Sequence, residues 1–265
     1  MIKDFEHSNY WALILGGSSG LGLATAKKLA QHGMNICVIH RNSRAQKNVI
    51  EGEFSVIEKH GIKFKSYNAD AFKEEKRTEI ISELKTILGD NGKIRTLVHS
   101  VAKGNLKPML SNDTPTLSSE DFNLTINAMA ISLYDWTQAV FSAKLFSDDA
   151  RIISFTSEGN IKAWKNYAAV SAAKVTLEAI TRNIALEFSP HGIKANCIQA
   201  GVTDTTSLRM IPGSEKLIKL ALTRNPYKRL TMPEDVANVV YLLSKDEASW
   251  INGCIIPVDG GEHIS

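Results

Sequence analysis

A tyrosine and a lysine seven residues apart, Tyr167 and Lys174, are the side chains best suited to chemistry. Both fall near the start of a predicted helix, and seven residues are close to two helical turns, so both project from one face. A neighbouring ammonium group favours the ionised phenol and lowers its pKa. A tyrosine held in this way can donate a proton or a hydrogen bond to a carbonyl oxygen. The same spacing also occurs among surface and packing residues, so the surrounding sequence decides between the two interpretations.

A glycine-rich turn lies between the first apolar run and the first predicted helix. Its spacing, counted from Gly16, is Gly-x-x-x-Gly-x-Gly. Glycine lets the backbone turn tightly and approach a pyrophosphate, and the amino end of a helix supplies free N–H groups and a positive dipole. Glycine clusters are common in turns, but this one has the strand–turn–helix context of a dinucleotide site. The predicted contacts are Gly16, Ser18, Ser19, Gly20, Leu21 and Gly22.

The segment after the second predicted strand indicates which dinucleotide binds. An NAD site usually places Asp or Glu here, whereas this chain has no carboxylate there and carries His40, Arg41 and Arg44. Arginine pairs with a 2′-phosphate, which a carboxylate would repel. The alternative is a solvated basic loop, and the position favours NADPH. After the third strand, Asp70 with Ala71 can accept the adenine amino group, or Asp70 can simply cap the following helix.

The elements that position these residues follow from the hydrophobic pattern. Short runs, several of them apolar throughout as buried parallel strands are, alternate with longer helical patterns. The predicted strands are residues 10–15, 35–39, 62–67, 96–99, 151–155, 193–198 and 254–258. The predicted helices are residues 20–32, 45–59, 73–88, 119–145, 166–188 and 233–243. The alternation predicts an α/β fold, a Rossmann-type doubly wound parallel sheet of about seven strands with helices on both faces.

No linker or break in composition divides residues 1–265, so a single domain is predicted. Residues 203–228 interrupt the alternation of strands and helices; they are polar and contain Pro212, Gly213 and Pro226. An insertion after the carboxyl end of a strand is a usual place for a substrate lid, and we predict one in this segment.

Composition and charge exclude several other classes of protein. The chain has 265 residues, 43% hydrophobic and 22% charged, which is globular composition and not that of a disordered chain. Its net charge of +3 is too weak and dispersed to indicate a nucleic-acid partner. The scattered Cys37, Cys197 and Cys254 fit neither a disulfide framework nor a metal site, so buried thiols in a reducing cytoplasm are expected. No signal peptide or membrane-spanning run is apparent, which predicts a cytoplasmic protein away from the membrane.

Motifs spread along nearly the whole chain, in order, resemble the short-chain dehydrogenase/reductase superfamily. They are the glycine turn, His99-Ser100-Val101-Ala102 after the fourth strand, Asn127 in Ile126-Asn127-Ala128, Ser157, the Tyr167/Lys174 pair, and Val258-Asp259-Gly260-Gly261 near the end.

Departures from the usual pattern of that superfamily resemble one branch of it. Most members carry Tyr-x-x-x-Lys, but the residue four before Lys174 is Val170, and the tyrosine stands seven before it. This spacing, His-Ser-Val-Ala in place of Asn-Asn-Ala-Gly, and Ala-Gly-Val in place of Pro-Gly resemble the enoyl-acyl-carrier-protein reductases. The glycine turn has the spacing of ordinary members, not the longer Gly-x5-Ser-x-Ala form. The combination is similar to the NADPH-dependent enoyl reductases of some bacteria.

The resemblance implies a role for each candidate residue. Tyr167 would stabilise the enolate oxygen of a trans-2-enoyl thioester, and Lys174 would hold the ribose hydroxyls of NADPH. Asn127 would hold the water that resupplies protons, or else be a buried amide that satisfies helix backbone. Ser157, at the spacing of the superfamily's catalytic serine, either binds substrate or supports its loop. Further cofactor contacts are implied for Ser100, Val101, Ala102, Ala200, Gly201, Val202, Thr203 and Thr205.

The resemblance also implies a substrate and an assembly. The enoyl thioester would be carried by acyl-carrier protein, in fatty-acid or related acyl-chain synthesis, and the enzyme would be a homotetramer that pairs through its two long helices and its C-terminal strand. One alternative is a 3-oxoacyl or other carbonyl reductase that uses Tyr167 in an unusual place. A second is a non-catalytic NADP-binding regulator, whose expected mark is a lost Tyr or Lys; both residues are present here.

Overall fold

The computed structural model describes residues 3–265, which are built around one seven-stranded sheet with the strand order β3-β2-β1-β4-β5-β6-β7. All six neighbouring pairs of strands are parallel, as predicted. The central strands are buried almost throughout, as in a sheet covered on both faces. The strands are β1 (Tyr10–Leu15), β2 (Asn35–His40), β3 (Phe64–Asn68), β4 (Lys93–His99), β5 (Phe146–Thr156), β6 (Ile193–Ala200) and β7 (Ile255–Val258).

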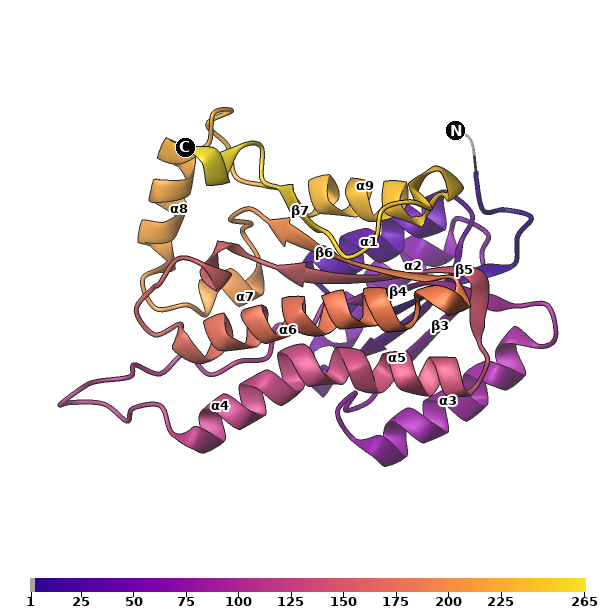
Figure 1. The fold of residues 1–265 in the computed structure, drawn as a ribbon, viewed down its shortest axis with the longest axis horizontal. Helices are drawn as coiled ribbons and strands as arrows, with labels where there is room; N and C mark the ends of the chain where they lie inside the picture. The colour runs from indigo at the N-terminus through magenta and orange to yellow at the C-terminus, as the bar shows by residue number, and fades with distance from the viewer. Residues whose placement is uncertain (1–2) are drawn as a thin grey trace.

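Helices cover both faces of this sheet (Figure 1). On one face lie α1 (Gly20–Gln31), α2 (Lys47–Glu58) and α9 (Pro233–Ser244). On the other lie α3 (Glu74–Leu88), α5 (Ser132–Ser142) and α6 (Ala168–Glu187), and α4 (Ser119–Ile126) extends the line of α5. Each layer has its own apolar core, because alternate residues of the strands point to opposite faces. Leu13 packs into one core and Ile14 into the other.

The strand order reverses between β1 and β4, and this switch point fixes where the candidate residues meet. The Gly16 N–H donates to the carbonyl of Ile39 at the end of β2 (2.8 Å), and the Ser100 N–H donates to the carbonyl of Leu15 (2.8 Å). The turns after β1, β2 and β4 are therefore fastened side by side at the carboxyl edge of the sheet. Ligands of open α/β sheets bind in the crevice at such a point.

Two predicted segments differ from expectation. Residues 119–145 do not form one helix, since a π-helix, Asn127–Ile131, joins α4 to α5 and the helical path ends at Ser142. The polar segment 203–228 contains two helices, α7 (Thr206–Arg209) and α8 (Ser214–Arg224). Only part of their apolar surface is buried, since Leu220 and Leu222 of α8 are exposed, and spacing alone did not reveal these helices among so many polar neighbours.

The surface differs from one expectation as well. Cys37 and Cys197 are buried as predicted, but Cys254 is exposed, because it precedes β7 at the uncovered edge of the sheet. Among residues 3–265, no helix is both long enough and apolar enough to cross a membrane.

Candidate active site

The glycine turn joins β1 to α1 and lies against the end of β4. Gly16 has a φ of +82°, and a Cβ atom there would lie 2.3 Å from the carbonyl oxygen of Ser100, so only glycine fits. A Cβ at Gly22 would likewise lie 2.3 Å from the carbonyl oxygen of Gly16. Ser19, the residue before α1, makes no side-chain capping hydrogen bond. The N–H groups of the first turn of α1, which have no partner within the helix, therefore remain available to an anion such as a pyrophosphate.

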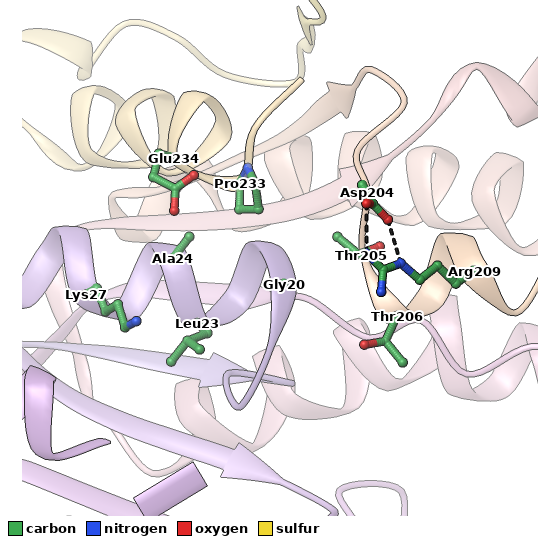
Figure 2. Close-up of a pocket in the computed structure, with 10 residues that line it drawn as sticks. All are labelled: Gly20, Leu23, Ala24, Lys27, Asp204, Thr205, Thr206, Arg209, Pro233 and Glu234. Carbon is green, nitrogen blue, oxygen red and sulfur yellow. Dashed lines mark hydrogen bonds and ion pairs between the residues drawn. The ribbon is translucent and has the colours of Figure 1, made fainter. Parts of the chain in front are cut away.

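A cavity of about 310 Å³ opens beside this turn, between α1, α7 and the amino end of α9 (Figure 2). Gly20 and Thr205, both predicted to contact the cofactor, line it. Figure 2 shows Arg209 turned toward Asp204, to which its Nε and Nη2 donate hydrogen bonds of 2.8 and 2.9 Å. The predicted acid–base residues do not line this cavity, so it belongs to the glycine turn and not to the Tyr167/Lys174 pair.

The carboxyl end of β2 carries the predicted basic side chains. Arg41 is exposed, and its Nη1 lies 2.9 Å from Oδ2 of Asp70, which follows β3. Arg44 begins a short 3₁₀ turn and is exposed. His40 Nδ1 lies 2.8 Å from Asn42 Oδ1, and burial lowers the pKa of His40. Arg41 and Asp70 thus pair with each other, although they were predicted to bind separate parts of the cofactor. A dinucleotide that binds to both side chains must separate them.

The turn after β6 holds the predicted residues 200–205 close to the C-terminal tail. Gly201 has no room for a side chain, since a Cβ there would lie 2.4 Å from Thr231 Oγ1. The Val202 N–H donates to Oε2 of Glu262 (3.2 Å), and the Val202 carbonyl accepts from the Thr231 N–H (3.1 Å). The backbone groups of Val202 are therefore already engaged. The hydroxyl oxygen of Thr205 accepts from the N–H of Leu208 at the amino end of α7, and its own O–H remains able to donate to a phosphate.

Tyr167 and Lys174 come together with Ser157 at the amino end of α6. Asn166 has a φ of +63°, a conformation that asparagine tolerates, and it turns the chain so that Tyr167 stands just before the helix. Tyr167 is 7% exposed, and Lys174 is buried with its Nζ donating to the carbonyl of Phe155 (2.6 Å). A side chain at Gly159 would lie 2.4 Å from Tyr167 Cε1, so the Ser157 loop is packed directly on the phenol ring.

The hydroxyl of Ser157 is buried and has no described partner in full hydrogen-bond geometry, although it lies near enough to the Tyr167 hydroxyl to influence the pKa of the phenol. An orphaned polar atom is costly in a protein interior, and at an active site it marks a place where a ligand group completes the set. The position of Ser157 beside Tyr167 is compatible with both predicted roles, substrate contact and loop support. The orphaned hydroxyl, the available amides of α1 and the buried ammonium of Lys174 all fit a nicotinamide dinucleotide with a carbonyl substrate.

Burial governs the electrostatics of this site. It raises the pKa of Tyr167, and the nearby Ser157 hydroxyl opposes that shift. It lowers the pKa of Lys174 to about 8, against the opposing effects of Cys197 and Glu178. Lys174 is thus largely protonated at neutral pH. The prediction that its charge lowers the pKa of Tyr167 is wrong for the free protein, because burial of the phenol raises that pKa.

Asn127 occupies the first position of the π-helix, which packs against α6. Its side chain is exposed and makes no hydrogen bond to the other described residues. The alternative prediction of a buried amide is therefore wrong, since Asn127 is exposed at the start of the π-helix. Such turns occur frequently at functional sites.

Sequence reasoning missed three buried polar groups around the site. Glu178, one turn beyond Lys174 on α6, accepts hydrogen bonds from Thr156 and from Asn160 (2.6 Å for the latter) and so ties the end of β5 to α6. The spacing of four from Lys174 could have indicated it. His99 Nε2 lies 2.8 Å from Ser132 Oγ, and burial with the charge of Lys174 lowers its pKa to about 3, so the imidazole is neutral.

The third missed group is Glu158, which follows Ser157 and is paired with Arg224 at the end of α8. Nothing in the local sequence indicates a partner 66 residues away.

The segment predicted as a lid covers Tyr167. Three of its apolar side chains, Leu208, Ile211 and Leu217, join a separate apolar cluster with Tyr167. Trp164 completes the enclosure, with its ring centroid 5.0 Å from that of Tyr167. Other members of the cluster are Leu106, Ile126, Met129, Val170 and Ala173. The phenol thus faces an apolar region roofed by α7 and α8.

The doubly wound sheet, the glycine turn at its switch point and the Tyr/Lys pair of α6 define an oxidoreductase of the short-chain dehydrogenase/reductase superfamily, whose members use a nicotinamide dinucleotide. More narrowly, residues 16–263 match the family described as Enoyl-(Acyl carrier protein) reductase, and the chain belongs to that family. This confirms the resemblance inferred from the sequence.

Characterised relatives include reductases of two thioester types. The chain is 30% identical over 251 residues to 3-oxoacyl-[acyl-carrier-protein] reductase MabA of Mycobacterium tuberculosis, covering 94% of this chain and 91% of the relative. It is 28% identical over 263 residues to the NADPH-dependent enoyl-[acyl-carrier-protein] reductase FabI of Staphylococcus aureus, covering 98% of each. The crystal structure of an NADH-dependent enoyl-[acyl-carrier-protein] reductase from Aquifex aeolicus has the same fold, with a TM-score of 0.80 at 24% identity over 97% of both chains.

Proposed function

We propose that this protein reduces a trans-2-enoyl thioester with NADPH, and that acyl-carrier protein carries the acyl group. One observation carries the proposal: the buried phenol of the site stands seven residues before Lys174, while the position four residues before it is the apolar Val170. The apolar cluster around Tyr167 supports an acyl chain as the substrate. The family and the FabI relative support the same assignment.

The displacement of the tyrosine suits the longer conjugated system of an enoyl substrate. In ketone reduction, the oxygen that gains charge is bonded to the carbon that accepts hydride. In enoyl reduction, that oxygen is three bonds from the accepting β-carbon. Three residues span about 4.5 Å along a helix. Moving the phenol by three positions therefore shifts the donor in step with the greater distance between the hydride-accepting carbon and the oxygen of an enoyl substrate.

Each residue of the pair has a distinct proposed task. NADPH, when bound, supplies the hydride. The Tyr167 hydroxyl donates to the developing enolate oxygen, which is stabilisation of the oxyanion type. Lys174 holds the ribose hydroxyls and, through its charge, favours the reactive state of the phenol. Ser157, with its orphaned hydroxyl, contacts the substrate carbonyl, and Asn127 holds the water from which protons are resupplied.

The choice of NADPH rests on the end of β2. Arg41 and Arg44 are exposed there, and Arg41 neutralises the carboxylate of Asp70. In the complex, the 2′-phosphate of NADPH takes the place of that carboxylate as the partner of Arg41. It carries more negative charge, and both arginines can bind it. The remaining contacts are proposed at the glycine turn, at residues 100–102 and at residues 200–205.

We further propose that residues 1–265 act as one domain, with residues 203–228 as its lid. The assembly is a homotetramer in the cytoplasm, formed through α4–α5, α6 and β7. Exposed apolar side chains support this interface, among them Tyr134, Val175, Leu186 and Ile255.

A second candidate is 3-oxoacyl thioester reduction. It is favoured by the 30% identity to MabA and by the Ser157 hydroxyl, which lies where the superfamily's ketone reductases place their serine.

One experiment separates the two functions. NADPH oxidation is followed with a crotonyl and an acetoacetyl thioester side by side, for the wild type and for Val170→Tyr. We expect the wild type to reduce the crotonyl thioester, and Val170→Tyr to gain weak activity only on the acetoacetyl thioester. Faster reduction of the acetoacetyl thioester by the wild type refutes the enoyl assignment and supports the second candidate.

A further inference from the structure

A buried ion pair ties the lid to the loop that carries Ser157. Glu158 is 7% exposed, and its two carboxylate oxygens accept hydrogen bonds from Nη1 and Nη2 of Arg224 at 3.0 and 2.7 Å. Arg224 is the last residue of α8. This two-pronged geometry is the strongest arrangement available to an arginine and a carboxylate. The proposed chemistry uses neither side chain.

Arg224 also donates hydrogen bonds to the C-terminal tail, which lies beside α8 in Figure 1. Its Nη2 donates to the carbonyl of Glu262 (2.6 Å), and its Nε donates to the carbonyl of Ser265 (3.3 Å). Glu262 is 1% exposed and supports Val202 in the turn after β6. One guanidinium therefore joins the end of the lid, the Ser157 loop and the tail.

A second cation on Glu158 does not reach the lid. Lys162 Nζ lies 3.0 and 3.1 Å from the two carboxylate oxygens, but it belongs to the same loop and its side chain is 42% exposed. Burial opposes the charged form of Glu158, yet the hydrogen bonds from Arg224 and Lys162 hold its pKa below the ordinary value. The carboxylate is therefore charged at neutral pH, and Lys162 offers a matched control for its pairing with Arg224.

The other end of the lid is held in a different way. Leu208, Ile211 and Leu217 contact the Tyr167 cluster through apolar surface, which is attractive but not directional. Tyr167 is only 7% exposed, so an acyl thioester reaches the phenol only when these side chains move aside. The lid thus has one end held over the phenol by apolar contacts and another end held by directional hydrogen bonds at Arg224.

We propose that the Arg224–Glu158 pair is the pivot of the lid: it fixes the C-terminal end of α8 to the Ser157 loop while α7 and the first turns of α8 swing away to admit the acyl chain. Arg224 and Glu158 are then positioning residues for substrate binding. The part of this inference that concerns an acyl ligand rests on the proposed function, whereas the pivot itself is a property of the protein without ligand.

The pivot is tested first by hydrogen–deuterium exchange of residues 214–224 in the free protein. Glu158→Gln keeps the shape of the side chain and removes its charge, and Lys162→Gln is the matched control. We expect faster exchange across α8 in Glu158→Gln and in Arg224→Gln, and wild-type exchange in Lys162→Gln. Arg224→Lys keeps the positive charge but cannot donate two parallel hydrogen bonds, and its exchange rate across α8 should lie between those of the wild type and Arg224→Gln. Thermal unfolding establishes that each variant is folded, and if Arg224→Gln is not, Glu158→Gln carries the test.

Kinetics test the consequence for the substrate. In Glu158→Gln, KM for the crotonyl thioester should rise on the order of tenfold, equivalent to about 1.4 kcal/mol, with a much smaller change in kcat and in NADPH affinity measured by fluorescence. Adding Arg224→Gln should raise KM by less than the product of the two single effects, because both substitutions break the same ion pair, and Arg224→Gln additionally removes the contacts with the tail.

Two results overturn the pivot: wild-type exchange of α8 in Glu158→Gln, or an equal increase in Lys162→Gln. A loss of kcat without a rise in KM refutes the positioning role. If the wild type reduces only the acetoacetyl thioester, the proposed function is refuted but the pivot is not. The exchange comparison needs no substrate, and the kinetic comparison can be repeated with the acetoacetyl thioester.

Discussion

Replacing Lys174 with methionine should stabilise the protein while abolishing its proposed activity. Burial lowers the pKa of Lys174 from its ordinary value of 10.5 to about 8. At about 1.4 kcal/mol per pKa unit, keeping this side chain charged in the folded protein costs about 3 kcal/mol at pH 7. The substitution also leaves the carbonyl of Phe155 without its donor, which costs about 1 kcal/mol. The net gain at pH 7 is therefore about 2 kcal/mol in the free energy of unfolding.

The pH dependence of this gain distinguishes charge from packing. Between pH 8 and 10.5 the unfolded chain still binds a proton at Lys174 that the folded protein has lost, so the wild type becomes more stable with rising pH in that window. Below pH 8 the penalty is present in full. By pH 10 it falls to about 1 kcal/mol, which the lost hydrogen bond offsets, and the two proteins should be about equally stable.

Urea unfolding at pH 7, 8, 9 and 10, at one fixed protein concentration, measures the difference. Lys59→Met, at an exposed position, serves as the control and should show a difference that does not vary with pH. If the curves for wild type and Lys174→Met stay parallel from pH 7 to pH 10, Lys174 does not carry a buried charge and the electrostatic argument for Tyr167 fails with it.

Four other outcomes are expected. Tyr167→Phe should lower kcat for the crotonyl thioester by ~10²–10³-fold in single-turnover hydride transfer, without loss of NADPH binding; a wild-type rate would assign the donor elsewhere. In Arg41→Ala/Arg44→Ala, the activation free energy calculated from kcat/KM for NADPH should rise by an amount on the order of 1.5–3 kcal/mol, while kcat/KM for NADH stays nearly unchanged. Equal kcat/KM for the two cofactors in the wild type would contradict the assignment. Gly159→Ala should displace the Tyr167 ring, whose Cε1 would lie 2.4 Å from the new Cβ, and so reduce turnover more than stability, which comparison of kcat with the melting temperature checks. Light scattering at micromolar concentration should give a tetramer, and a mass of 29.1 kDa would rule it out.

The sequence was sufficient for those features that depend on a short window of the chain. Apolar runs located the seven strands, although β5 begins at Phe146, five residues before the predicted start. The signal was clearest for central strands such as β1 and β4, because burial on both faces requires continuous apolar sequence. The glycine turn was predictable because close backbone approach at Gly16 permits no side chain. Tyr167 and Lys174 were predictable from their spacing and the motifs around them, although Tyr167 stands just before α6 and not within it.

Features that depend on contacts between distant segments were decided only by the tertiary structure. Arg41 meets Asp70 because β2 and β3 are neighbours in the sheet, and Glu158 meets Arg224 because the end of α8 lies against the Ser157 loop. The pKa of Lys174 follows from burial that no spacing reveals. Local periodicity specifies which residues share a face, whereas the partner and the solvent exposure of a charged side chain are fixed by how whole elements pack. The sequence by itself therefore determined the candidate residues of this reductase, and only the folded chain determined which charges are buried and which side chains of residues 203–228 pack against the phenol.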